Sequence, residues 1–79
     1  MKLKADVSLP EFLRKANLCE GDVFFETPEG DCLNIKSQLS KYVFLAAVNS
    51  QRDLIRLGEV VFRQEDDQAI LKEFLIAES

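Results

Sequence analysis

The sequence predicts one small α+β domain whose strands and helices follow in the order β-α-β-β-α-β-α. The chain has 79 residues, 47% of them hydrophobic and six of them Phe, which supplies the apolar mass for one core near the lower size limit of a self-sufficient domain. Alternation of side chains over residues 1–6 and a turn at residues 28–31 indicate β-structure. Apolar residues at helical spacing in other segments indicate helices. We therefore expect a single domain over residues 1–79.

Residues 1–6 alternate between apolar and charged side chains, which is typical of a half-buried strand. Ser8 can then cap a helix, Pro10 suits its first turn, and Glu11 lies three residues after Ser8, as in a capping box. The helix, expected over 8–19, would end before Gly21. Its apolar stripe at helical spacing contains Leu9, Phe12, Leu13 and Ala16.

A β-hairpin is expected next. Residues 23–27 are rich in strand formers, and residues 32–35 form the expected return strand. Between them Pro28 presets φ at the second turn position, and Gly30 accepts a positive φ. The loop is longer than the two residues of the tightest hairpins.

The second half of the chain contains two expected helices and one expected strand. Ser37 can cap the first helix, although the continuous apolar run 42–48 is also compatible with a buried strand; the cap favours a helix. Residues 49–53 are polar and predict a loop, 59–63 predict a strand, and 67–77 predict a final helix. The apolar residues at helical spacing after Ser37 are Leu39, Tyr42, Val43, Ala46 and Ala47.

Charge and hydropathy exclude several classes of protein. The net charge is −4 and acidic and basic residues are interspersed, which argues against nucleic-acid binding because a phosphate binder concentrates its cations on one face. No apolar segment approaches the ~20 residues of a membrane helix. Residues 1–6 lack the apolar region of a signal peptide. We therefore expect a cytoplasmic protein that does not bind a membrane.

The sequence contains few residues that could support catalysis or bind a metal ion. Cys19 and Cys32 are too few for a tetrahedral zinc site, and we expect both to be buried apolar residues; a cysteine-based carrier or redox role is a minor alternative. The acidic run 65–67 lacks the ligand spacing of a calcium loop. The chain contains no histidine that would activate Ser8 as a nucleophile. We expect no enzyme activity, no metal and no cofactor.

The segment Leu33-Asn34-Ile35-Lys36-Ser37 resembles the valine-asparagine-leucine-lysine-serine segment after the central hairpin of HPr, the histidine-containing phosphocarrier of the bacterial sugar phosphotransferase system. The resemblance is strongest over residues 21–39 and weak over 46–57. It covers most of the chain because the order of elements is also the order of the HPr family. It implies an open-faced sandwich, with a four-stranded antiparallel sheet and all helices on one face.

The chain departs from the family at the phosphocarrier site. Val7, Ser8 and Leu9 precede Pro10, whereas the family has histidine, alanine and arginine before its proline. The nucleophile and its cation are both missing, so the chain cannot carry a phosphohistidine. The resemblance therefore implies a catalytically silent relative that acts by binding a protein partner.

Ser37 matches the serine that HPr kinase phosphorylates in the family, at a helix N-terminus where a phosphate is favourable, and Lys36 adjoins it as a counter-charge. We favour the simpler interpretation that Ser37 is an N-cap. The resemblance also implies partner contacts at Lys36, Gln38, Leu39 and Tyr42.

Leu39 and Val43 are equally explained as core residues, which we favour, whereas the Tyr42 hydroxyl favours partial exposure. The main alternative for the whole chain is an unrelated α+β assembly module that forms a homodimer through an exposed sheet face or edge.

Overall fold

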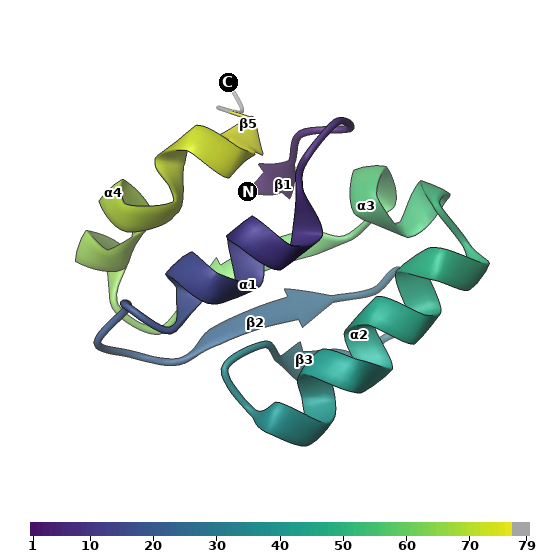
Figure 1. The fold of residues 1–79 in the computed structure, drawn as a ribbon, viewed down its shortest axis with the longest axis horizontal. Coiled ribbons are helices and arrows are strands. Elements are labelled where there is room, and N and C mark those ends of the chain that lie inside the picture. Colours follow the sequence, from purple (N-terminus) through teal and green to yellow (C-terminus); the bar gives the residue numbers. More distant parts are fainter. Residues whose placement is uncertain (77–79) are drawn as a thin grey trace.

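The computed structural model describes residues 1–76 as two small antiparallel sheets with helices packed against them (Figure 1). The first sheet pairs β1 (Lys2–Leu3) with β5 (Leu75–Ile76). In the second, β2 (Val23–Glu26) lies between β3 (Cys32–Asn34) and β4 (Glu59–Phe62). The helical elements are α1 (Leu9–Ala16), α2 (Gln38–Ser50), α3 (Asp53–Leu57), the 3-10 turn η1 (Glu65–Asp67), α4 (Gln68–Leu71) and the 3-10 turn η2 (Lys72–Phe74).

The α+β class is confirmed, but the prediction of one four-stranded sheet is wrong, because the five strands within residues 1–76 divide into sheets of two and three. Backbone hydrogen bonds join the two sheets at Met1 and Val60. The Val60 N–H donates to the Met1 oxygen at 2.6 Å, and the Met1 nitrogen donates to the Val60 oxygen at 3.1 Å. One such residue pair brings β1 beside β4 but is too short to continue the ladder.

The predicted helix 67–77 is also wrong in extent. The helical segment begins earlier, with η1, and ends with η2 at Phe74, after which β5 runs along β1. The Lys4 N–H donates to the Phe74 oxygen at 2.9 Å, so a further bond holds the start of β5 next to the N-terminal strand. Residue 77 lies outside the described residues.

The core lies against one face of the three-stranded sheet. Val23, Phe25 and Val60 are buried on this face. Phe24 and Val61 are paired across β2 and β4 and are less buried, Val61 being 38% exposed. Alternation along the strands therefore gives the sheet one covered and one open face.

Phenylalanine rings join the helices to this sheet. The Phe44 ring of α2 lies 4.9 Å, centroid to centroid, from the Phe25 ring of β2 in an edge-on arrangement. The Phe12 ring of α1 lies 6.5 Å from Phe44 and 5.7 Å from Phe74. Edge-to-face contacts of this kind add to the free energy of burying the rings.

The first helix confirms its predicted apolar stripe, since all four residues of that stripe are buried. Ser8 occupies the N-cap position with extended backbone, but its side chain makes no capping bond, and Glu11 pairs with Arg14. The helix ends at Ala16 rather than at 19. The Leu18 N–H donates to the Lys15 oxygen, and the next residue repeats this three-residue spacing, so the chain tightens there into turns.

The segment expected as a loop at 49–53 is mostly helical. The second helix continues to Ser50, and α3 begins at Asp53. Leu54 and Ile55 are buried, so α3 contributes side chains to the core. The polar residues before it did not indicate a helix.

A close approach of backbone and ring at Gly58 predicts a stability effect. A Cβ atom on Gly58 would lie 2.1 Å from the Phe25 ring, whereas a Cβ on Gly21 would meet only the Gln64 side chain, at 2.9 Å. We expect Gly58→Ala to lower the free energy of unfolding by about 2 kcal/mol or more, because the Phe25 ring is enclosed. The exposed Gln64 can move, so Gly21→Ala should cost less than about 1 kcal/mol.

Urea unfolding of the two variants measures both effects. Equal costs would contradict the close packing of Gly58 on Phe25.

Candidate functional site

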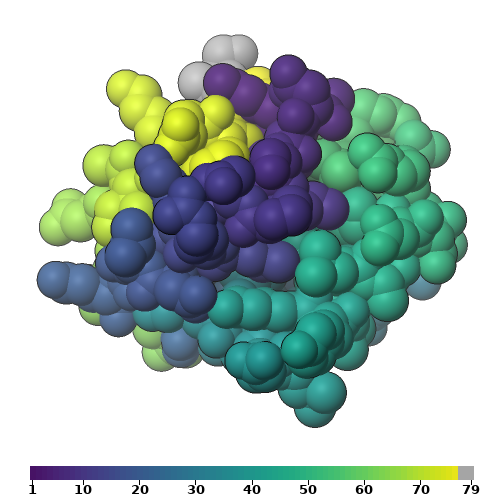
Figure 2. Space-filling view, viewed as in Figure 1, coloured from purple at the N-terminus to yellow at the C-terminus, as the bar shows by residue number. Residues whose placement is uncertain are grey.

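The outward side of α2 is apolar. Leu39, Tyr42 and Val43, which we call the α2 stripe, are 74%, 62% and 48% exposed, while Phe44 and Val48 of the same helix are buried. In the space-filling view α2, in teal, forms the lower surface of the molecule (Figure 2). The exposure predicted for Tyr42 is confirmed. The core positions favoured for Leu39 and Val43 are wrong, because Phe44 and Val48 turn the opposite side of the helix inward.

Ser37 lies at the N-cap of α2, as predicted. Its backbone is extended. Its backbone carbonyl oxygen accepts from the Lys41 N–H at 2.9 Å, and its N–H donates to the backbone carbonyl oxygen of Asn34 at 3.0 Å. The hydroxyl makes no capping bond, so the cap is a backbone feature. Gln38, the next residue, is exposed, and its amide nitrogen is 3.4 Å from the Tyr42 hydroxyl.

The Lys36 ammonium is bound to the connection between α1 and β2. It donates to the Cys19 oxygen at 2.6 Å and to the Gly21 oxygen at 3.1 Å. Lys36 was expected to face a partner or a phosphate on Ser37. In the structure its charge instead satisfies two backbone carbonyl groups.

Asp67 binds the same connection from the other side. Its carboxylate accepts from the Glu20 N–H at 3.1 Å and from the Gly21 N–H at 2.9 Å, and the residue is 4% exposed. We call Lys36 and Asp67 together the loop clamp, because they bind the carbonyl and N–H groups of residues 19–21. The sequence suggested only a helix cap for Asp67, since no local pattern indicates contacts over 46 residues.

The two cysteines differ. Cys19 is buried, as expected, whereas Cys32 is exposed, contrary to expectation, because it lies on the edge strand β3. Burial raises the pKa of the Cys19 thiol, and the nearby Asp67 carboxylate raises it further, against an opposing effect of Lys36. A raised pKa leaves less thiolate at neutral pH, which disfavours thiol chemistry at Cys19.

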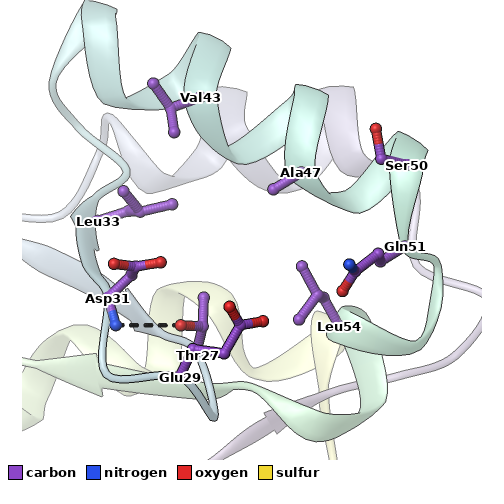
Figure 3. A pocket seen from close by; sticks show the side chains of 9 residues that line it. All are labelled: Thr27, Glu29, Asp31, Leu33, Val43, Ala47, Ser50, Gln51 and Leu54. Atoms are coloured by element: carbon purple, nitrogen blue, oxygen red, sulfur yellow. Dashed lines mark hydrogen bonds between the residues drawn. The ribbon is translucent and has the colours of Figure 1, made fainter.

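A groove lies between the hairpin turn and the C-terminal half of α2 (Figure 3). Its volume is about 360 Å³. The lining side chains are Thr27, Glu29, Asp31, Leu33, Val43, Ala47, Ser50, Gln51 and Leu54. Val43 belongs both to this groove and to the α2 stripe, so the two surfaces are continuous. Sequence reasoning missed the groove, although the acidic turn residues were a signal that could have drawn attention to it.

Two further findings concern metal ions and membranes. No group of three or more His, Cys, Asp or Glu side chains within residues 1–76 is arranged to hold a metal ion. None of the helices in the same stretch combines the length and the hydrophobicity that crossing a membrane requires.

Comparison of the chain with protein-family models, with characterised proteins and with solved structures found no match. The resemblance to HPr therefore remains a prediction from the sequence.

Removing a hydrogen-bond acceptor from the loop clamp should lower the free energy of unfolding. In Asp67→Asn one carboxylate oxygen becomes an NH₂ group, which cannot accept a hydrogen bond from the Glu20 or the Gly21 N–H. We expect a loss of about 1–3 kcal/mol in the free energy of unfolding, because a buried donor is left unsatisfied. Asp66→Asn, at the exposed neighbouring position, should change it by less than about 0.5 kcal/mol.

Urea unfolding of both variants at neutral pH is the measurement. If Asp67→Asn were as stable as Asp66→Asn, Asp67 would not hold the connection between α1 and β2.

Proposed function

We propose that this chain is a catalytically silent, HPr-like domain that binds a protein partner through α2. The observation that carries the proposal is the α2 stripe. Its three large apolar side chains are exposed on one side of one helix. Exposed contiguous apolar surface of this kind marks interaction sites more often than isolated exposed residues do.

The spacing of the stripe suits recognition by a complementary surface. Tyr42 and Val43 follow Leu39 by three and four residues, so the three side chains are neighbours on the helix. Tyr42 adds a ring and a hydroxyl, which can be buried at an interface with the polar end still hydrogen-bonded. Polar Gln38 and Lys41 border the stripe, as a polar rim borders the apolar centre of many interfaces.

The order of elements supports the HPr-like part of the proposal. The mutual bonds between Met1 and Val60 support this, because such a pair is typical of antiparallel neighbours. With β1 next to β4, the strands would follow in the order β3, β2, β4 and β1, which is the arrangement that the proposed HPr-like relationship requires. The absence of histidine from the sequence supports a silent domain. The HPr resemblance would make the protein bacterial, and the cytoplasmic location expected from the sequence remains part of the proposal.

Ser37 is the position where such a domain would be regulated. A phosphate there would lie at the N-terminus of α2, where free N–H groups and the helix dipole favour negative charge. Because Lys36 already binds two carbonyl groups, the helix N-terminus would supply most of the stabilisation. The added charge would change the surface next to Leu39 and leave the fold intact.

A homodimer formed through the open sheet face is the second candidate, favoured by the exposed Val61. Its neighbour Phe24 is covered by the Arg63 guanidinium, 5.9 Å from the ring centroid, which leaves this face less apolar than the α2 stripe. Sedimentation of the isolated chain over a range of concentrations tests whether it dimerises, and cross-linking at positions 39 and 42 tests whether α2 lies in the interface.

Photo-cross-linking tests the proposal in the cells that make the protein. We expect a benzoylphenylalanine side chain at position 39 or 42 to yield the same adduct, because both positions would lie inside one interface. Position 69, exposed on α4, is the matched control and should yield none. Ser37→Asp should alter the yield at position 39 if the regulatory interpretation is correct.

Equal adducts at all three positions, or none, would contradict binding through α2. An adduct of twice the chain mass at positions 39 and 42 would indicate a second copy as the partner. An unchanged yield in Ser37→Asp would leave Ser37 as a structural cap only.

A further inference from the structure

We propose that the groove beside the α2 stripe receives an arginine side chain of the partner, flanked in the partner sequence by an aliphatic residue. This inference rests on the proposed function, because the groove and the stripe share Val43. It names the chemistry of the partner, which the stripe alone does not define.

The first observation is the shape and composition of the groove. Its volume of about 360 Å³ is at the lower end of the ~300–1,000 Å³ typical of ligand pockets, so it suits one or two side chains. One part of the lining is apolar and comes from β3, α2 and α3. The apolar residues are Leu33, Val43, Ala47 and Leu54.

The second observation is the charge of the opposite wall. Glu29 and Asp31 of the hairpin turn supply carboxylates, and Figure 3 shows both on the turn side of the groove, across from α2. Neither carboxylate forms a salt bridge with a basic residue anywhere in residues 1–76. No Lys or Arg lines the groove. The free site is therefore acidic, and a cation complements it.

The third observation is that the turn is held in one conformation. The Thr27 N–H donates to the backbone carbonyl oxygen of Asp31 at 2.9 Å, and the Gly30 N–H donates to the backbone carbonyl oxygen of Thr27 at 3.0 Å. The Asp31 N–H donates to the Thr27 hydroxyl at 3.1 Å (Figure 3). Gly30 adopts a φ of 98°, which favours glycine. A held turn presents its carboxylates with little ordering cost on binding.

Arginine fits this arrangement better than other cations. Its aliphatic stem can lie along the apolar wall while the guanidinium reaches the carboxylates, and its planar donors suit carboxylate oxygens. An aliphatic neighbour in the partner would then reach Val43 and the α2 stripe. The groove thus couples an apolar contact to a charged one.

Selection from a phage-displayed random-peptide library against the intact chain tests the inference. We expect the enriched peptides to carry arginine next to leucine, isoleucine or valine. Replacing that arginine by citrulline, which keeps the shape and removes the charge, should weaken binding by about tenfold or more. The double variant Glu29→Gln/Asp31→Asn should weaken the arginine peptide equally.

The control double variant Glu65→Gln/Asp66→Asn removes an exposed acidic pair elsewhere and should bind like wild type. Peptides that lose affinity for Leu39→Ser/Tyr42→Ser but not for the groove variant would overturn the inference and leave the proposed function standing. Peptides insensitive to both sets of substitutions would overturn both. A selection without enriched peptides would overturn the inference, and the cross-linking result would then decide the proposed function alone.

Discussion

The contact of Phe44 with Phe25 and Phe12 determines the surface of this protein. One face of a surface helix packs against the core, and the contacts of Phe44 with these two rings determine which face of α2 does so. At about 100° per residue, Tyr42 points about 160° away from Phe44 and Leu39 about 140° away. A helix that is apolar on both sides must therefore leave one apolar side in water when the other is buried in so small a domain.

The loop clamp and the hairpin turn extend this arrangement to the rest of the molecule. Lys36, just before α2, binds the carbonyl groups after α1, and Asp67 binds the N–H groups of the same connection. The connection after α1 thereby links the start of α2 to η1, which contains Asp67. The acidic turn faces the other end of α2 across the groove, so one helix carries both the apolar stripe and a wall of the acidic site.

Local patterns predicted much of the fold. The stripe of α1 and the turn at Gly30 were correct, because spacing and backbone preference are properties of neighbouring residues. The prediction of which α2 residues are buried was wrong. Residues 42–48 are all apolar, so helical periodicity does not show which face of the helix packs against the core. The clamp of Asp67 and the strand β5 were missed because they depend on contacts between distant parts of the chain.

Leu39 and Val43 are in water while Val48 of the same helix is buried, and the interaction surface depends on this difference. Paramagnetic relaxation of methyl signals by a soluble gadolinium chelate measures this directly in the isolated chain at low concentration. The account predicts strong relaxation at the Leu39 and Val43 methyl groups and weak relaxation at Val48 and Val60. Protection of Leu39 equal to that of Val48 would contradict it.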